Sequence, residues 1–547
     1  MFSLIERVFF LPWAYCLAHL RQLWAPLAFI SRPALPSPLE LRPPSGKQIK
    51  QQLNDFIDSI DKDAICALAS KHNGGLSCDI RCQSNGSFNV CFVIDFSDST
   101  TRLVRLPLEP AVRDVWDKVR SEVYTMQYLR DHTNIPIPQV YAYGRSRLQR
   151  NSSALQVFMF LEYIDGRPLE KAMLRKSSED RRHQLLGEIA DVLAQLRGLE
   201  FSQGGSLIGN NETAGAWSQI RRILMPPREE SFTPQSTKHH MHRPRVVGAF
   251  SLRKNELQVD GYTAPRFAAT TTREFLEEQY RLMRCMWSIP CQHLSQQCAE
   301  RQLFAIHALR LESAQQTLGL KGNCDTIFCL LHPDFRAENI IVDDELHLRG
   351  VIDWEFSELV PRLAFVPPLW ITGHDPVSVG TKINLLSDFL SILSSRKHIS
   401  SSHSQLAHEW DFKDDTQFPI AHILRDPTET EFLFYEYIYP KLYSEPSDDL
   451  IPAFFQRLEN EELRQFVQQR VRASEQYTQY LRDNHLFDDE AQEWQKIRDS
   501  MAASQELLKK SRKSDARIQE LLAGADKLLH SSREQTQAPQ TESSNPA

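Results

Sequence analysis

The spacing of apolar residues in the first third of the chain predicts a small sheet covered by helix. Residues 49–72 carry apolar side chains at helical intervals and end at a Gly-Gly pair, which favours one helix there. A second helical pattern, with apolar positions three and four apart, covers 111–130. Four strand-like runs surround it: 87–96, 102–106, 139–143 and 156–163. This order of strands, helix and strands indicates an α+β unit.

Beyond this region the pattern is mainly helical. Apolar residues recur at helical spacing over 181–199 and 271–318, and two further apolar stripes cover 458–481 and 494–522. Between 201 and 270 the sequence is irregular and polar, so we expect an insertion. Its run K-H-H-M-H-R-P-R contains three histidines but no carboxylate or cysteine at ligand spacing. That composition favours a solvated loop over a metal site.

Changes of composition along the chain suggest five segments. A Pro-rich stretch before residue 49 is typical of an extended linker, and the last residues lack apolar anchors. The expected boundaries are 1–48 for an N-terminal apolar segment and linker, 49–162 for an N-terminal lobe, 163–370 for a C-terminal lobe with the 201–270 insertion, 371–530 for its helical extension, and 531–547 for a disordered tail.

The first thirty residues are apolar but broken. His19, Arg21 and Gln22 interrupt the apolar run, and no span of about 20 apolar residues exists in the chain, so we expect no transmembrane helix. A secretory signal is disfavoured because Glu6 accompanies Arg7 ahead of the apolar run. We expect a cytoplasmic protein. A mitochondrial location, or association with a membrane surface through residues 1–30, remains the alternative.

Composition and charge narrow the classes of partner. The 547 residues include 63 Lys and Arg against 70 Asp and Glu, for a net charge of −7. Such a chain has no global basic footprint for a nucleic-acid polymer, so we expect none as a partner. Ten cysteines without paired C-x-x-C ligand motifs indicate free thiols rather than a disulfide framework or a metal site.

The strongest chemical signal is the run L-L-H-P-D-F-R-A-E-N-I-I-V at 330–342. An apolar strand is expected to deliver His332 and Asp334 to a loop, and Asn339 follows immediately before a second apolar strand. A turn then leads back through an apolar run that delivers Asp353. Surface turns rich in Asp and Asn would explain the residue types but not this spacing with apolar flanks. Two carboxylates and a carboxamide are therefore expected at the ends of adjacent strands.

Phosphoryl transfer needs such a set of groups. One carboxylate must accept or orient the proton of the acceptor hydroxyl, and Asp334 suits that role. Mg²⁺ prefers hard oxygen ligands, and Asn339 and Asp353 suit that role. His332 would brace the loop through hydrogen bonds. These residues are the candidate catalytic and metal-binding groups.

This stretch resembles the catalytic segment of the aminoglycoside phosphotransferase family, in which H-x-D-x₄-N is followed by I-D-W-E, here at 352–355. The resemblance extends over roughly residues 80–370, and the run L-A-F-V-P-P-L-W is similar to fungal members. It implies a two-lobed, protein-kinase-like α+β fold, with a small antiparallel-sheet N-lobe and a mainly helical C-lobe. Protein kinases proper would show D-F-G and A-P-E, so the resemblance favours a small-molecule acceptor.

The resemblance also implies roles in the N-lobe. Arg105, in V-R-L-P, takes the place of the family's phosphate-pairing lysine, and Glu122 resembles the acid that pairs with that cation. The departure from lysine affects nucleotide affinity, because the guanidinium differs in shape from an ammonium. Gly86 and Ser87 lie in the turn expected over the phosphates, which has one glycine instead of a glycine-rich pattern. Backbone groups around Glu162 are expected to face adenine.

We therefore expect an ATP- and Mg²⁺-dependent phosphotransferase that moves the γ-phosphoryl group to a hydroxyl of a small molecule. The first alternative is a catalytically impaired, kinase-like scaffold that binds a protein partner through its C-terminal helices. Arg105 and the single glycine of the phosphate turn favour that alternative. The second alternative is an atypical protein kinase. No residue pattern in the C-terminal lobe identifies the acceptor.

Overall fold

The computed structural model describes residues 41–209, 229–233, 245–248, 250–262, 268–319, 326–374, 385–411 and 416–488. Residues up to Asp483 form one compact unit, and a second unit begins at Asn484. Three predicted segments therefore lie outside the described residues: most of the N-terminal segment, the apolar stripe over 494–522, and the tail.

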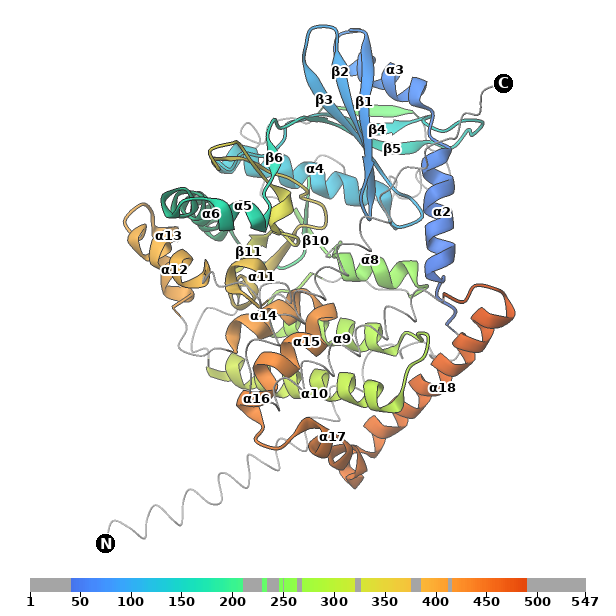
Figure 1. The fold of residues 1–547 in the computed structure, drawn as a ribbon, viewed down its shortest axis with the longest axis vertical. Coiled ribbons are helices and arrows are strands. Elements are labelled where there is room, and N and C mark those ends of the chain that lie inside the picture. The colour runs from blue at the N-terminus through green and yellow to red at the C-terminus, as the bar shows by residue number, and fades with distance from the viewer. Residues whose placement is uncertain are drawn as a thin grey trace, which may run out of the picture. The chain divides into compact units, whose positions relative to one another are not determined.

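The N-terminal lobe is built on a six-stranded antiparallel sheet, as the sequence predicts in kind (Figure 1). The strand order is β1-β2-β3-β5-β4-β9. The strands are β1 (Cys78–Asn85), β2 (Asn89–Phe96), β3 (Thr101–Pro107), β4 (Val140–Ser146), β5 (Gln156–Glu162) and β9 (Glu230–Phe232).

Two of these strands were not expected. Strand β1 is mostly exposed and polar, so it lacks the apolar alternation that reveals a strand. Strand β9 comes from the segment predicted to be an irregular insertion, and it pairs with the outer edge of β4. Sequence patterning misses both because edge strands bury few side chains.

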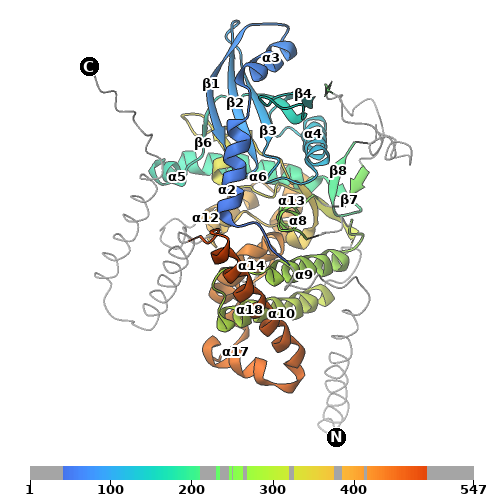
Figure 2. The same cartoon turned by 90° about the vertical axis from the view of Figure 1, so that its right-hand side faces the viewer.

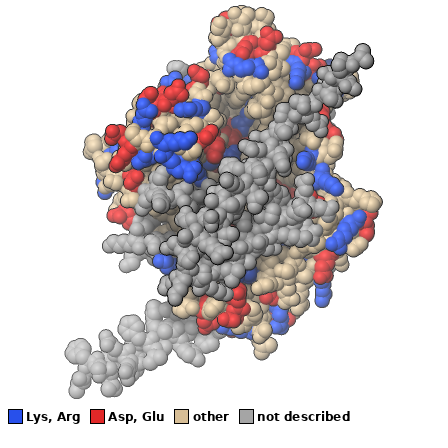
Figure 3. All heavy atoms as spheres, viewed as in Figure 1, with Lys and Arg blue, Asp and Glu red and all other residues tan. Residues whose placement is uncertain are grey.

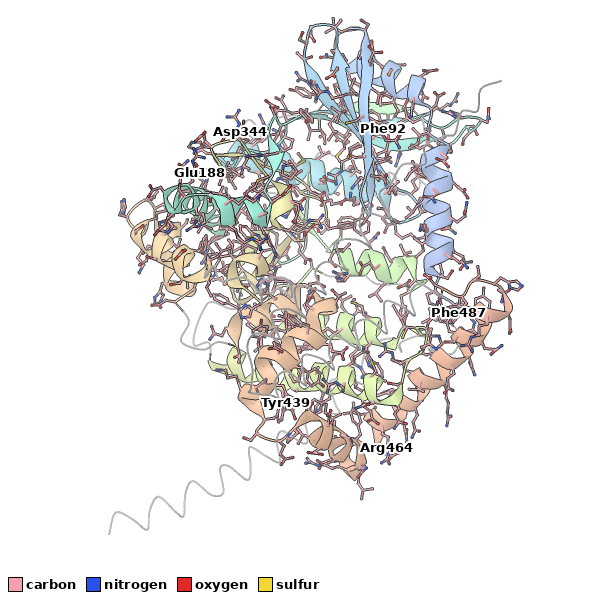
Figure 4. All side chains as sticks on the ribbon, viewed as in Figure 1. Phe92, Glu188, Asp344, Tyr439, Arg464 and Phe487 are labelled. Atoms are coloured by element: carbon pink, nitrogen blue, oxygen red, sulfur yellow. The ribbon has the colours of Figure 1, made fainter. Side chains whose placement is uncertain are left out.

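Helices cover both faces of the sheet. Helix α4 (Val115–His132) packs against β4 and β5 and starts four residues later than its apolar pattern suggests. The opposite face carries a separate apolar cluster that includes Ile65 of α3 and Phe92 of β2, and Figure 4 labels Phe92 within the sheet.

The helix expected over 49–72 is two helices, α2 (Gly46–Asp58) and α3 (Lys62–His72). The Asp61 carboxylate accepts hydrogen bonds from the backbone N–H groups of Asp63 and Ala64, and so caps the start of α3. The Asp61 N–H group donates to the carbonyl of Leu148 at 2.9 Å. This capping and the tertiary contact break a pattern that periodicity alone presents as continuous.

The candidate chemical motif lies on two small sheets. Strand β11 (Phe328–Leu331) pairs with β14 (Glu358–Pro361) and β7 (Glu200–Phe201), whereas β12 (Ile340–Val342) pairs with β13 (Leu348–Val351) and β6 (Arg167–Pro168). Helix α6 (Glu179–Gly198) supports both, because it packs on β11 and the Glu188 carboxylate accepts the Leu348 N–H at 2.6 Å. Figure 4 labels Glu188 on α6 and Asp344 in the β12–β13 turn.

The rest of the described chain is mainly helical, as predicted (Figure 2). Its remaining α-helices are α5 (Lys171–Lys176), α8 (Leu252–Val259), α9 (Thr272–Ser288), α10 (Gln296–Gly319), α11 (Leu369–Thr372), α12 (Leu385–Ser395), α13 (Ser401–Glu409), α14 (Gln417–Arg425), α15 (Thr430–Leu433), α16 (Tyr439–Leu442), α17 (Ser447–Gln456) and α18 (Glu461–Asp483).

The late helices are part of the same core as the motif. One apolar cluster runs from Val119 of α4 to Val467 of α18. In α18, the Arg470 guanidinium donates to the Gln302 side chain of α10 at 2.6 Å, and the Tyr477 hydroxyl donates to the carbonyl of Pro43. The C-terminal helices up to Asp483 therefore stabilise the lobe instead of forming a detached appendage.

The expected insertion also contributes ordered structure. Strand β8 (Ser206–Ile208) pairs with β10 (Arg245–Val247), and Lys254 of α8 forms a buried ion pair with Glu278 of α9 at 3.0 Å. Most of the histidine-rich run, 238–244, lies outside the described residues. Because this segment is polar in composition, the sequence did not predict strand β10 or helix α8, which contact β8 and α9.

No helix in the described part of the chain is long and apolar enough to cross a membrane. On the face shown in Figure 3, basic and acidic side chains of the described residues are interspersed. That face offers no continuous basic surface among the described residues.

Candidate active site

The loop after β11 places Asp334 and Asn339 against each other. The Asn339 side-chain amide donates to the Asp334 backbone carbonyl at 2.9 Å and to its carboxylate at 3.1 Å. A short 3₁₀ helix, η4 (Ala337–Asn339), brings the two residues together. The Arg336 guanidinium lies 3.2 Å from the same carboxylate, which stays 45% exposed. Asp334 is therefore fixed in direction yet open to solvent.

The surroundings of Asp334 raise the pKa of its carboxyl. Burial is the largest cause, and the negative charge of Asp353 acts in the same direction. Arg336, His332 and the hydrogen bond from Asn339 oppose the rise. A carboxylate with a raised pKa accepts a proton more readily than an ordinary surface aspartate.

His332 connects the loop after β11 to the segment after β13. Its Nε2 atom donates to the Ile352 carbonyl at 2.9 Å, and its ring packs edge-on against Phe335 and Trp354. Burial lowers the pKa of His332, so the ring is neutral at physiological pH. The Ile352 N–H in turn donates to the Asn339 carbonyl at 3.0 Å. Through these two hydrogen bonds, both His332 and Asn339 are held to Ile352, the residue before Asp353.

The backbone is strained where Asp353 leaves β13. Asp353 has a φ of 68° and Phe356 has a φ of 57°, a left-handed conformation that is unfavourable for residues with a side chain. Such strain persists only when the surrounding structure enforces it, and it concentrates at functional sites. The I-D-W-E motif therefore occupies a segment whose conformation is held by its contacts.

Arg105 joins the N-terminal lobe to this segment. From β3, its Nη1 atom donates to Glu122 of α4 at 2.7 Å, and its Nη2 atom donates to Asp353 at 2.5 Å. The Glu355 carboxylate lies 3.3 Å from the same Nη2. Burial acts to lower the pKa of Arg105, but the three carboxylates raise it well above its ordinary value. Arg105 is thus permanently charged and shared among three acids.

Lys118 is a functional candidate that the sequence motifs missed. It lies on α4 one turn before Glu122, and its ammonium group is 3.3 Å from the Glu122 carboxylate and also paired with Glu355. The Asn89 amide of β2 donates to Glu355 at 2.9 Å. The Lys118 side chain is only 1% exposed. The available signal was a lysine on the apolar face of a predicted helix, four residues before the candidate acid.

Two cations and three acids therefore form one buried network, to which we give the name charge network: Arg105, Lys118, Glu122, Asp353 and Glu355. Burial acts to raise the pKa of Asp353, but Arg105 and Lys118 reverse this and lower it. Asp353 is therefore ionised at physiological pH.

Gly86 and Ser87 lie at the tip of the β1–β2 hairpin. They are exposed, and the Gly86 N–H donates to the Asn89 carbonyl at 2.9 Å. Phe88, the next residue of the same turn, contacts the strained segment, because its ring packs edge-on against Phe356. The turn of the hairpin is thus tied to the motif through Phe88, whereas Gly86 and Ser87 lie outside the charge network.

Glu162 ends β5, where the chain passes to the C-terminal lobe. Its carboxylate accepts the Gln139 N–H at 2.9 Å, and its own N–H donates to the Gln139 carbonyl. The Glu162 carboxylate is therefore bound to the backbone of Gln139. The structure places Glu162 away from the ion pairs of Arg105.

The donor set fits Mg²⁺ only as a partial coordination shell. Within the described ranges no group of three or more His, Cys, Asp or Glu side chains is arranged so that it could hold a metal ion by itself. Asn339 and Asp353 supply two oxygen donors on linked loops. This fits a metal that keeps waters and takes further oxygens from phosphates.

The comparisons with known proteins identify the family. Residues 82–364 match the model of the phosphotransferase enzyme family, abbreviated APH, over more than half of the 547 residues. The chain belongs to this family. The fold is the two-lobed, protein-kinase-like α+β fold that the sequence predicts, and the protein is a phosphotransferase by class.

Individual relatives are distant. The chain is 22% identical to clavilactone A biosynthesis cluster protein Y of Ampulloclitocybe clavipes over 338 residues, which are 60% of this chain and 71% of that protein. It is 25% identical to altered inheritance of mitochondria protein 9 of Debaryomyces hansenii over 38% of this chain, and spans 32% of that protein. A putative aminoglycoside phosphotransferase structure from Ralstonia eutropha is 14% identical, with a TM-score of 0.38, covering 76% of this chain and 99% of that chain.

Proposed function

We propose that this protein transfers the γ-phosphoryl group of ATP, with Mg²⁺, to a hydroxyl of a small molecule. The observation that carries the proposal is the convergence of Asp334, Asn339 and Asp353 on linked loops, with Arg105 aimed at them from β3. Family membership supports the reaction class.

Asp334 is the proposed group that accepts or orients the hydroxyl proton. It is exposed enough to meet an acceptor, and Asn339 holds its direction. The raised pKa of Asp334 brings its proton affinity closer to what a general base needs near neutral pH. His332 is proposed to position the loop through the hydrogen bond from its Nε2 atom to the Ile352 carbonyl.

Asn339 and Asp353 would hold Mg²⁺, which neutralises charge on the phosphates. Arg105 is the proposed partner of the nucleotide phosphates, and Glu122 orients it through their buried ion pair. Gly86 and Ser87 are proposed to offer backbone N–H groups from the hairpin tip, and the backbone around Glu162 to face adenine. The lowered pKa of Asp353 keeps its carboxylate ionised and ready for a cation.

One observation favours a second candidate, the kinase-like scaffold without turnover. The Asp353 carboxylate is already paired with Arg105, and a charge network of this kind can stabilise a lobe interface without any nucleotide. A scaffold does not require the oxygen donors of Asn339 and Asp334 to be placed together. We therefore place this candidate second.

Calorimetric titration of the purified protein with ATP, in Mg²⁺ and in EDTA, separates the two candidates. A phosphotransferase binds ATP in Mg²⁺ and binds it more weakly in EDTA. No heat of binding under either condition contradicts the enzyme and favours the scaffold.

The cellular location is also a proposal. We propose a cytoplasmic protein, with mitochondria as the alternative that the name of the Debaryomyces hansenii relative supports. Fractionation of the native host's cells with antibody detection tests this directly.

A further inference from the structure

Arg425 is a partly buried cation that the charge network does not include. It is the last residue of α14, beyond the stretch that matches the family. Together with His332 and Phe335 it lines a small cavity, whose other walls are Leu193, Leu196, Leu331, Phe365, Val366 and Pro368. A guanidinium therefore lies beside the loop that carries Asp334.

The hydrogen-bonding capacity of Arg425 is largely unused. Its Nη1 atom donates one long bond, 3.3 Å, to the Val366 carbonyl, and its Nε atom is buried without a partner. No carboxylate of the described residues lies within 4.0 Å of it. A guanidinium offers five N–H donors in a planar fork, and among the described residues the Val366 carbonyl is the one acceptor recorded for them.

Acids near Arg425 do not neutralise it. Its neighbour Asp426 is paired with Arg253 at 2.8 Å. Glu358 of β14 acts on Arg425 through its charge, yet its carboxylate makes no hydrogen bond or ion pair with the described residues. Burial raises the pKa of Glu358 to about 7, so at neutral pH it carries only part of a charge. The cation and the acid lie apart, each without a direct partner.

Arg425 is recessed but reachable. Burial lowers the pKa of its guanidinium to about 10, so it stays protonated at neutral pH although few groups solvate it. Part of the Arg425 and Glu358 side chains still meets solvent. The C-terminus of a helix favours a cation, but it does not require one that is desolvated and unpaired. A protonated guanidinium with unused donors, beside a small cavity and partly exposed, is suited to binding an oxyanion at its edge.

The recess adjoins the proposed chemistry. The charge of Arg425 acts on both His332 and Asp334, and His332 lines the same cavity. An acceptor held at Arg425 would therefore present its hydroxyl near Asp334.

We propose that Arg425 binds a carboxylate or phosphate group of the hydroxyl-bearing acceptor, so that the substrate is a hydroxy acid or a phosphate ester. The role of the bound molecule as the phosphate acceptor rests on the proposed function. Binding of an oxyanion at Arg425 does not depend on it. A purely cationic amine is disfavoured, because it would meet the Arg425 charge.

The test is calorimetric titration of the full chain with glycerate and glycerol 3-phosphate, with glycerol as the uncharged control. Each titration is made with and without saturating Mg²⁺ and the non-hydrolysable ATP analogue AMP-PNP, which prevents the probes from occupying the nucleotide phosphate site. We expect at least one acid to bind in the millimolar range or tighter, and glycerol not to bind. The two acids distinguish a carboxylate subsite from a phosphate subsite.

The variants are Arg425→Met, Arg425→Lys and, as a matched control, Arg457→Met, which removes an exposed arginine after α17. We expect Arg425→Met to weaken acid binding at least tenfold, Arg425→Lys to weaken it less, and Arg457→Met to leave it unchanged. Because the Arg425 charge is poorly satisfied, Arg425→Met should leave the melting temperature unchanged or raise it. A structural arginine would instead lower the melting temperature on removal.

Three results overturn the inference: neither acid binds, glycerol binds as tightly as the acids, or Arg425→Met binds the acids as the wild type does. A different result marks failure of the proposed function. If the protein binds the acids through Arg425 but does not bind Mg²⁺-AMP-PNP, the oxyanion site stands and the phosphotransferase mechanism falls.

Discussion

The Arg105 guanidinium and the Asp353 carboxylate form an ion pair with 2.5 Å between Nη2 and Oδ1, although 248 positions separate them in sequence. The proposed phosphate partner and the proposed metal ligand therefore satisfy each other. In the proposed mechanism, nucleotide and metal binding would exchange this ion pair for contacts with phosphate and Mg²⁺, while Glu122 would remain paired with Arg105.

Arg105→Lys tests whether the fork of the guanidinium matters. A lysine ammonium is a point charge and cannot reach Glu122 and Asp353 from two separate nitrogens, so one acid loses its direct partner. We expect the free energy of unfolding to fall by roughly 1–3 kcal/mol and the KM for ATP to rise. Urea denaturation and steady-state kinetics measure the two effects.

The matched control for Arg105→Lys is Arg81→Lys, which changes a solvent-exposed ion pair with Asp95 in the same sheet. Exposed pairs contribute little to stability, so this variant should unfold as the wild type does. Equal urea midpoints for Arg105→Lys and the wild type would contradict the role of the fork.

Lys118→Met tests the residue that the motifs missed. Removing the ammonium leaves Glu122 and Glu355 with one cation fewer in a buried site. Breaking a buried pair from one side costs about 3–5 kcal/mol, and we expect a loss of that order in the free energy of unfolding. Lys50→Met on α2 removes an exposed lysine and is the control. A loss no larger than that of the control would show that Lys118 has no structural role in the network.

The pH dependence of turnover should follow Asp334. Its pKa is raised above 3.8, and it must be deprotonated to accept a proton, so kcat/KM should fall as pH falls through a value above that of an ordinary aspartate. Arg336 lowers this pKa, so Arg336→Gln should move the acidic limb of the profile to higher pH. The control is Arg349→Gln, an exposed arginine of β13. An unchanged acidic limb in Arg336→Gln would exclude Asp334 as the titrating group.

Asp334→Asn separates chemistry from binding. The amide cannot accept the hydroxyl proton, and we expect turnover to fall by about 10²–10⁴-fold while ATP binding persists. Asp344→Asn changes a 94% exposed acid in the turn of the neighbouring hairpin and should retain full turnover. Full activity in Asp334→Asn, measured by ADP formation, would remove Asp334 from the mechanism.

The sequence predicted how the local residues of the candidate site are placed relative to one another. His332, Asp334 and Asn339 fall within eight residues, so one loop places them and their spacing is visible in the chain. The turn before β13 was also predictable, because the Asp343 carboxylate accepts N–H groups of Glu345 and His347 within its own loop. Short-range hydrogen bonding fixes such features with little help from the rest of the fold.

The contacts between residues far apart in the chain were harder to predict from the sequence. Glu355 contacts Lys118 and Asn89, which are 237 and 266 positions away in the sequence, and no local pattern predicts those contacts. Strand β1 was missed for a related reason, since pairing with β2 rather than apolar alternation holds it in place. Arg425 lies outside the recognised motif, and only tertiary packing shows that its Nε atom is buried without an acceptor.

The most direct test of the account is calorimetric titration of ATP, in the presence of Mg²⁺, into the wild type and Asp353→Asn. The account predicts Mg²⁺-dependent binding by the wild type and its loss in Asp353→Asn, because the amide lacks the charge that the metal requires. Asp334→Asn, titrated in parallel, should bind ATP almost as the wild type does. Equal Mg²⁺-dependent binding by Asp353→Asn and the wild type, or no binding by the wild type, would contradict the account.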